Sequence, residues 1–372
     1  MENQNAVKYH YGSFPPRDLD LNKVLGALLK ATDALARYDQ VLKSLHSTEF
    51  FLVPLRNQEA IISSRMEGTI STLDEILQYQ ADHDESSVED HEKVRSDIYE
   101  TVLYQRALTS AQRAMQDGYP LSEHLVKSIH QQLLSFGRGA QKSPGKYKTE
   151  QNYLADKIKQ KIEFIPISPE KLIDGMEVLF NYIHESPDAV LIKTALMHLE
   201  FEALHPFKDG NGRIGRMLIT LYLWAAGSIS APHFYISGYM EKHKDLYIDT
   251  MRRVSSDGDW EAWCNFFFKA IEDQAHKNIQ VAESIKQLYE EMKSIFADTL
   301  SSKWSVNALD FIFANPIFRN NRFTSDSGIP AQTASRFTRL LLDRGILRTI
   351  KDASGRRPAL YAFEPLLKLV RV

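Results

Sequence analysis

A polar string of twelve residues between two apolar segments constrains the fold of this chain more than any other feature. Residues 205–216 read HPFKDGNGRIGR and lie between the helix-like segments LIKTALMHLEFEAL and RMLITLYLW. This order predicts a tight loop that joins two buried helices. Gly210 and Gly212 let the loop backbone approach a ligand closely, because glycine has no Cβ. The free amides and the dipole of the second helix favour an anion at its start.

The charged side chains of this string suit a phosphate ligand. Arg213 and Arg216 are three residues apart, so both project near the first helical turn and can form charge-assisted hydrogen bonds there. Asp209 can hold a magnesium ion that bridges phosphates. His205 can take a proton from an attacking hydroxyl near neutral pH. The residues therefore predict a phosphate cradle that differs from the glycine-rich Walker loop, which the sequence lacks.

The string resembles the signature of the Fic family, H-x-F-x-D/E-G-N-G-R-x-x-R, and matches it at every fixed position. The resemblance implies a nucleotidyltransferase that moves AMP from ATP to Tyr, Thr or Ser hydroxyls of target proteins and of itself, releases diphosphate and uses Mg²⁺. It also implies a role for each residue: His205 is the general base, Asp209 the magnesium ligand, Phe207 a buried anchor, Gly210, Asn211 and Gly212 the anion hole, and Arg213 and Arg216 the ligands of the β- and γ-phosphates.

Two further segments, 143–147 and 162–166, resemble the flap of the same family. Short alternating runs around IEFIPIS predict a hairpin near 150–166, and its edge can accept a segment of a protein substrate as an added strand. Phe164 and Ile165 are expected over the nucleotide. Tyr247 is expected on the adenine side, with a half-buried helix aromatic as the alternative interpretation.

Residues 63–68 read SSRMEG and resemble the inhibitory pattern S/T-x-x-x-E-G/N of the family, here placed N-terminal to the core. Ser63 and Glu67 are four apart and are expected on one helix face, with Gly68 allowing close approach. The resemblance implies that Glu67 pairs with Arg216, removes the ligand of the γ-phosphate and forces ATP into an unproductive pose. The alternative is an exposed surface glutamate. AMP removal, which this glutamate supports in some relatives, is left open.

Helical patterns dominate the chain. Residues 21–80 read as helical, including one apolar stripe formed by Ile62, Met66, Ile70, Leu73 and Leu77. Residues 1–20 are predicted to be irregular. The fold is predicted to be mainly α: a Fic-type helical core with a short β-hairpin flap, plus a C-terminal winged helix-turn-helix. The predicted domains are an N-terminal helical module with the inhibitory helix (1–115), the Fic catalytic core (116–300) and a winged-helix-like domain (301–372).

The last 70 residues or so have their own pattern: helices near 306–314 and 330–344 and two short strands that form a wing near 346–363. Thr333, Ser335, Arg336 and Arg339 lie on the candidate recognition helix, and Arg348, Lys351, Arg356 and Arg357 lie on or beside the wing. This layout suits contacts with DNA phosphates, although winged helices also serve as protein docking modules.

Net charge and cysteine content limit the binding partners and the cellular compartment that can be expected. The net charge of −3 over 372 residues argues against chain-wide attraction to nucleic acid or to anionic membrane. Cys264 is the only cysteine, so an intrachain disulfide is excluded and a reducing cytoplasm is favoured. No apolar signal segment is found at the N-terminus, and a cytoplasmic protein without membrane contact is expected. Homo-oligomerisation is left open.

Two alternative functions remain at this stage. The first is a DNA-binding regulator in which the Fic core has become a ligand sensor. The second is transfer of another phosphate-containing group, such as phosphoryl or phosphocholine. Gly212 argues against the phosphorylating branch of the family, which tends to carry lysine at this position.

Overall fold

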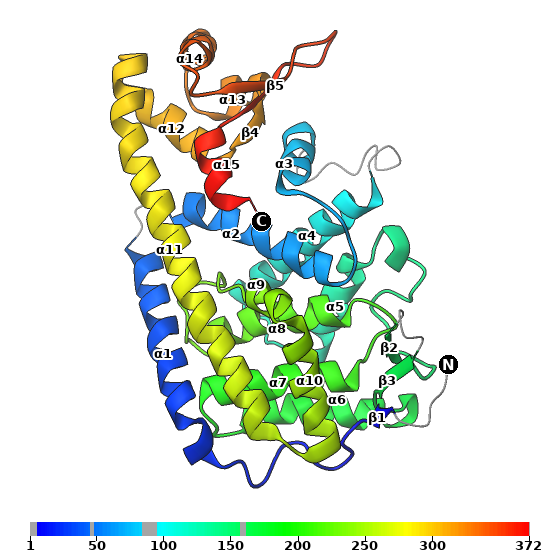
Figure 1. The fold of residues 1–372 in the computed structure, drawn as a ribbon. Coiled ribbons are helices and arrows are strands. Elements are labelled where there is room, and N and C mark those ends of the chain that lie inside the picture. Colours follow the sequence, from blue (N-terminus) through cyan, green and yellow to red (C-terminus); the bar gives the residue numbers. More distant parts are fainter. Residues whose placement is uncertain (1–5, 45–47, 84–94, 157–160, 372) are drawn as a thin grey trace.

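The computed structural model describes residues 6–44, 48–83, 95–156 and 161–371. It is mainly α-helical with two small sheets, and the predicted fold class is confirmed. Figure 1 shows the longest helix, α11, running the length of the molecule beside α1 and on to the C-terminal elements. The sequence at 81–93, ADHDESSVEDHEK, is acidic and poor in apolar residues, which predicts a connector, and most of it lies outside the described residues.

The N-terminal region is built from α1 (Leu21–Lys43), α2 (Thr48–Met66), α3 (Leu73–Asp82) and α4 (Ser96–Gln116). The apolar stripe predicted over 62–77 is divided between two helices, so the prediction of one stripe is wrong. Gly68, with a φ of +89°, turns the chain just after α2, a conformation that glycine adopts without strain. Ile70 in this turn is 70% exposed, and a capping box of Thr72 and Glu75 starts α3.

The central region carries the signature string between two packed helices. It comprises α5 (Glu123–Leu133), the short 3₁₀ helix Gly137–Gly139, α6 (Pro169–Glu185), α7 (Val190–Leu204), α8 (Asn211–Ala225), α9 (Ser237–Lys242), α10 (Lys244–Asp257) and α11 (Trp260–Leu300). Almost every residue of α7 is buried. The indole of Trp263 on α11 donates a hydrogen bond to the carbonyl of Ala195 on α7 at 2.8 Å, so Trp263 packs α11 against α7.

The predicted hairpin is formed by β2 (Leu154–Asp156) and β3 (Lys161–Ile165), which pair antiparallel. The prediction that residues 1–20 are irregular is wrong at one place, because β1 (Val7–Lys8) pairs in parallel with β3. The amide of Tyr9 extends this pairing by donating to the carbonyl of Ile165 at 2.9 Å. β3 is therefore the central strand of a sheet ordered β1-β3-β2.

The C-terminal region has two strands where the wing was predicted, and three elements that the sequence did not indicate. Its elements are α12 (Ser305–Ala314), β4 (Ile317–Arg319), α13 (Asn320–Asp326), α14 (Ala331–Asp343), β5 (Arg348–Lys351), β6 (Leu360–Ala362) and α15 (Glu364–Val370). The unexpected ones are β4, which extends the sheet to the order β4-β6-β5, together with α13 and α15.

The C-terminal region packs on α2 and α3. The Gln58 side chain donates to the carbonyl of Val370 at 2.8 Å, and Arg319 is paired with Asp82 at 2.6 Å. We propose the division of the chain at 115/116 and 300/301, near the ends of α4 and α11.

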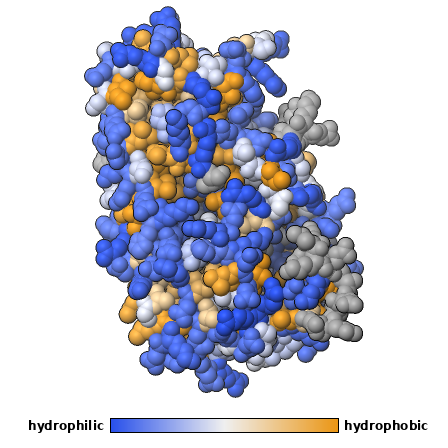
Figure 2. All heavy atoms as spheres, in the orientation of Figure 1, coloured by the Kyte–Doolittle hydropathy of each residue, from blue (hydrophilic) through white to orange (hydrophobic). Residues whose placement is uncertain are grey.

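No helix within the described ranges is both long and apolar enough to cross a membrane. Figure 2 shows a visible face that is largely hydrophilic, with apolar side chains gathered mainly over its upper part, where the C-terminal helices lie.

Candidate functional site

The signature loop (residues 205–210) is closed by hydrogen bonds from the side chain of Asn211, the first residue of α8. His205 ends α7 with a φ of +45°, and Gly210 precedes α8 with a φ of +80°. The buried side chain of Asn211 accepts from the amide of Phe207 at 2.9 Å and donates to the carbonyl of Phe207 at 2.8 Å. The Asn211 side chain therefore fixes the loop, and its backbone amide at the start of α8 is the group left for an anion.

A buried histidine of α5 supports the loop from behind. His130 stacks on Phe207 with ring centroids 3.7 Å apart. One ring nitrogen accepts from the amide of Gly145 at 2.8 Å, and the other lies 3.0 Å from the carbonyl of Asp209, to which it donates. Burial lowers the pKa of His130 to about 4, so the ring stays neutral. His130 is a core histidine with both ring nitrogens hydrogen-bonded, and Phe207 is buried beneath the loop.

Two residues that the sequence analysis did not select hold the other side of the loop. The ammonium of Lys148 donates to the carbonyl of Leu204 at 3.0 Å and to the side chain of Asn152 at 2.8 Å. The amide of Asn152 donates to the carbonyl of His205 at 3.0 Å and of Phe207 at 3.1 Å. Burial lowers the pKa of Lys148 to about 7. The only earlier signal was the resemblance of residues 143–147, just before Lys148, to the family's flap.

The electrostatic environment keeps His205 neutral. Burial and the nearby Lys148 lower the pKa of His205 to about 4, and these causes outweigh Glu67 and Asp209, which raise it. An imidazole with this pKa is deprotonated at physiological pH. It can therefore accept a proton, as a general base must.

The guanidinium of Arg216 on α8 is buried and donates three hydrogen bonds to residues at and just after the end of α2. It donates to the hydroxyl of Ser63 at 2.9 Å, to the carbonyl of Ser63 at 2.9 Å and to a carboxylate oxygen of Glu67 at 2.9 Å. Only 2% of the Arg216 side chain is exposed, against 37% of the Glu67 side chain. We call Ser63, Glu67 and Arg216 the Arg216 cluster.

Glu67 reaches this cluster from a turn and not from a helix face. α2 ends at Met66, so the prediction that Ser63 and Glu67 share a helix face is corrected: Gly68 turns the chain and directs Glu67 over α8. A Cβ on Gly212 would collide with the Glu67 carboxylate and lie 2.9 Å from Arg216. Burial opposes ionisation of Glu67, but Arg216 outweighs it, and the pKa of Glu67 is lowered. An ionised carboxylate thus lies against the glycine at the start of α8.

Arg213 has donors to spare at the same helix start. It is 4% exposed, and its Nε and Nη1 atoms are buried without a hydrogen-bond partner among the described residues. Its Nη2 lies 3.5 Å from Asp209, whose side chain is 39% exposed. Buried donors without partners are costly, and a phosphate ligand would satisfy them.

The donor set at this place fits ATP with magnesium. Within the described ranges no group of three or more His, Cys, Asp or Glu residues could hold a metal by itself. Magnesium is commonly bound by one or two carboxylates together with substrate phosphates. Asp209 is the carboxylate at this site that could contribute in this way.

Glu202 is a third residue that the sequence analysis did not select. It lies one turn before His205 on α7, and a Cβ on Gly215 would collide with its carboxyl oxygen. Burial raises the pKa of Glu202 to about 7, although Arg216 acts in the opposite direction. The side chain also lines the cleft described next.

A cleft of about 990 Å³ lies between the hairpin, α7 and α10. Phe164 lines it, whereas Ile165 is not among its lining residues. The placement of both residues over a nucleotide stays a prediction. The structure does not bring Tyr247 to this cleft. Tyr247 is 5% exposed and its hydroxyl bonds to His198 at 2.8 Å, so the alternative of a packed helix aromatic describes it better than an adenine contact.

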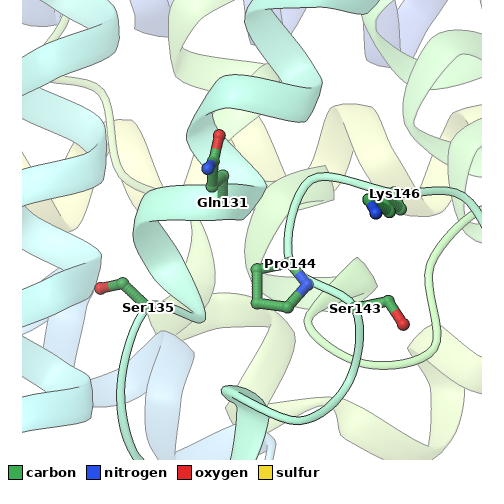
Figure 3. A pocket seen from close by; sticks show the side chains of 5 residues that line it. All are labelled: Gln131, Ser135, Ser143, Pro144 and Lys146. Atoms are coloured by element: carbon green, nitrogen blue, oxygen red, sulfur yellow. The ribbon is translucent and has the colours of Figure 1, made fainter.

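A separate hollow of about 430 Å³ lies beside α5 and the loop at 143–146. Figure 3 shows the side chains that line it. Its side chains come from α5 or its end and from the loop at 143–146, and they do not converge on one point. The hollow shares no residue with the signature loop. Its lining residues are Gln131, Ser135, Ser143, Pro144 and Lys146.

Comparison with known proteins places this geometry in a family. The model of the Fic/DOC family matches residues 120–223, and the model of the Fic/DOC family N-terminal region matches residues 25–113. The first match contains the signature loop and the hairpin. The second contains α2 up to and beyond Glu67.

Curated relatives match at modest identity. A probable protein adenylyltransferase of Aquifex aeolicus is 25% identical over 142 residues, which are 34% of this chain and 44% of that protein. Protein adenylyltransferase fic-1 of Caenorhabditis elegans is 25% identical over 105 residues, which are 27% of this chain and 19% of that protein. The chain thus spans less than half the length of these relatives.

Solved structures show the same fold. A Fic family protein from Desulfovibrio desulfuricans superposes with a TM-score of 0.59 at 17% identity, covering 94% of this chain and 98% of that one. Fic-1 from C. elegans superposes with a TM-score of 0.52 at 17% identity, covering 70% and 73%. The two family models together match just over half of the chain, and their matches include both the signature loop and the Arg216 cluster. This protein therefore belongs to the Fic/DOC family.

Proposed function

We propose that this chain is a protein adenylyltransferase, which transfers AMP from ATP to a Tyr, Thr or Ser hydroxyl of a target protein or of itself. The observation that carries the proposal is the set of groups at the start of α8. Two buried guanidiniums, Arg213 and Arg216, lie at a helix N-terminus that contains glycine, and a short loop joins this helix to the neutral His205. The names of the curated relatives support the same activity.

The proposed reaction forms a bond between the target hydroxyl oxygen and the α-phosphorus and breaks the bond to the diphosphate, which leaves. His205 accepts the hydroxyl proton. Arg213, Arg216 and the amides of residues 210–212 bind the phosphates. Asp209 would hold magnesium, which supplies neutralisation of phosphate charge when it is bound. Phe164 lies in the cleft where we place the adenosine end.

We propose that Glu67 inhibits this reaction. Its carboxylate takes a hydrogen bond of Arg216 and lies against Gly212, where the γ-phosphate would otherwise bind. The Glu67 carboxylate would repel the negatively charged γ-phosphate, and it would occupy the Arg216 guanidinium that the phosphate needs as its cation. ATP would then bind in a pose that is unproductive for transfer.

A target segment is proposed to dock at the hairpin, within residues 150–166. β1 covers one edge of β3, so we place the added strand on the outer edge of β2. DNA contact through the C-terminal region stays a prediction, supported by the exposure of Ser335, Arg336 and Arg339 on α14. Self-association and the cytoplasmic setting also stay predictions.

Parallel reactions with ATP labelled at the α- or γ-phosphate test the proposal. The Glu67→Gly chain should incorporate the α-label into itself and into added target proteins, and none of the γ-label. Incorporation of the γ-label instead would indicate phosphoryl transfer. No incorporation of either label, together with tight ATP binding, would favour a ligand sensor. The Glu67→Gly/His205→Ala chain is the control for label bound without transfer.

A further inference from the structure

A cavity of about 690 Å³ lies beside the middle of α2, before the end of the helix that contacts Arg216. Its walls come from α2, α3 and α4 and from the C-terminal elements α12, β4 and α13. Figure 1 shows these elements grouped above the central helices, with α2 crossing between the two regions. The volume lies within the range of small-molecule sites.

The charge of this cavity has one sign. Four arginines line it, and none of the described residues that line it is Asp or Glu. We call it the arginine cavity; its arginines are Arg56, Arg106, Arg113 and Arg322.

Two of these arginines have no counter-ion within the described part of the chain. Neither Arg56 nor Arg106 forms an ion pair there, and the buried Nε of Arg56 lacks a hydrogen-bond partner. The guanidinium carbon of Arg106 lies over the ring of Tyr99, 5.9 Å from the ring centroid. Arg113 and Arg322 have interactions of their own as well and add to the positive charge. Partly buried guanidiniums that share a cavity without a carboxylate favour an external anion.

The rest of the lining suits an organic group attached to that anion. Amide side chains form a hydrogen-bonded row, in which Gln80 donates to Gln105 at 2.8 Å and Gln105 donates to Asn57 at 2.5 Å. The rings of Tyr79 and His83 stack on each other with centroids 4.3 Å apart. Amides offer both donors and acceptors, and aromatic faces contact planar ligands.

We propose that the arginine cavity is a second ligand site, which binds a small organic polyphosphate such as a nucleoside triphosphate. The arginines contact the phosphates, and the amides and the aromatic pair contact the organic group. The site is separate from the signature loop, because the two share no residue. Arg56 and Ser63 are seven residues apart on α2, roughly 10 Å along the helix axis, so the two sites are joined by one helix.

Calorimetric titration of the full chain with ATP tests this site. The background is Arg213→Ala/Arg216→Ala, which disables the nucleotide site at the signature loop. Saturable binding of one ATP should remain, and adenosine without phosphates should not bind. Adding Arg56→Gln/Arg106→Gln should weaken ATP binding about tenfold or more, the effect of lost charge-assisted hydrogen bonds. Arg37→Gln, on the exposed face of α1, is the matched control and should leave the affinity unchanged.

A charge-insertion variant keeps the test valid if the arginine changes disturb folding. Thr109 lines the cavity, and Thr109→Glu places a carboxylate among the arginines, which compensates their charge while it repels phosphate. This variant should keep the thermal midpoint and lose ATP binding. The proposal is overturned if the background chain does not bind ATP, if adenosine binds equally well, or if ATP affinity is the same in the cavity variants. Binding of duplex DNA or of an acidic peptide without binding of ATP would overturn it as well.

Discussion

Two regions along α2 place arginines in opposite situations. At the end of the helix, Arg216 is buried and its guanidinium donates to the hydroxyl and carbonyl of Ser63 and to the carboxylate of Glu67. In the middle of the helix, Arg56 faces a cavity in which the described lining residues include no carboxylate. A buried charge is costly unless it is paired and hydrogen-bonded. The first region therefore supplies its own anion, whereas the second is arranged for an anion from outside.

The difference bears on which state of the chain is stable without ligand. In the Arg216 cluster the guanidinium is already hydrogen-bonded without ligand, so under the proposed function a phosphate would have to displace Glu67 to bind Arg216. In the arginine cavity no such displacement within the described residues is needed. The first arrangement suits a site that is kept inactive, and the second a site that responds to ligand concentration.

His205→Ala should have the largest effect of the proposed variants, and it should lower the transfer rate without changing ATP binding. In the Glu67→Gly background, loss of the general base should lower the transfer rate about a hundred- to ten-thousandfold. ATP affinity should stay roughly intact, because His205 acts on the hydroxyl and not on the nucleotide. Rates come from α-labelled ATP and affinities from calorimetry. Transfer by His205→Ala at the background rate would remove His205 from this role.

Asp209→Ala should have the next largest effect and should be confined to the signature loop. Loss of the magnesium ligand removes several kcal/mol of charge stabilisation, more than about a hundredfold in rate at fixed magnesium. The measurement is a magnesium titration of the transfer rate. Coincident titration curves for the variant and its background would show that Asp209 is not a ligand.

Glu67→Gly tests the internal anion of the Arg216 cluster directly. The variant frees Arg216 from its hydrogen bond to Glu67 and removes the repulsion between that carboxylate and the γ-phosphate. The transfer rate should therefore rise about ten- to a hundredfold. Arg216→Ala should not reproduce the gain, since it removes the partner of Glu67 and the ligand of the γ-phosphate together. The double variant should stay slow. The assignment fails if Glu67→Gly leaves the rate unchanged while Arg216→Ala accelerates it.

The pH dependence of kcat/KM tests the environment of a single group, the imidazole of His205. The pKa of His205 is lowered to about 4, so its proton-accepting form is present above that pH and is lost as pH falls through it. The Glu67→Gly chain also lacks one of the groups that raise this pKa, so its kcat/KM should stay level from pH 8 down to at least about pH 5 and fall only at lower pH. Lys148→Met, which removes one cause of the low pKa, should move the fall to higher pH. A fall centred near 6.5 in the Glu67→Gly chain would contradict the assigned environment of His205.

The loop and the fold class could be predicted from sequence because both depend on local information. The signature residues are contiguous, and the helices that flank them have clear apolar patterns. The contact between Glu67 and Arg216 spans 149 positions, yet two short motifs predicted it through the family resemblance. The placement of Glu67 on a helix face was wrong because α2 ends at Met66, one residue before Glu67. Gly68, with its left-handed backbone, turns the chain directly afterwards.

The remaining parts depend on contacts that no local pattern announces. Lys148 and Asn152 act through backbone carbonyls of another segment, 56 and 53 positions away. The pairing of β1 with β3 joins residues far apart in the chain and needs only two residues. The arginine cavity combines residues between 53 and 132 with residues between 314 and 322, and only tertiary packing brings them together.

The smallest expected effect is on stability and compares one arginine from each region. Arg216→Met leaves the carbonyl of Ser63 and the Glu67 carboxylate without their donor, and should lower the thermal midpoint by the equivalent of about 1–3 kcal/mol. Arg106→Met removes one of four like charges around a cavity, and should leave the midpoint unchanged or raise it by the equivalent of about 1 kcal/mol. Arg37→Met, at an exposed ion pair, should change little. The readout is the thermal midpoint by circular dichroism without ligand. A drop for Arg106→Met as large as that for Arg216→Met would mean that the cavity arginines already have an internal counter-charge, and the contrast between the two regions would then be lost.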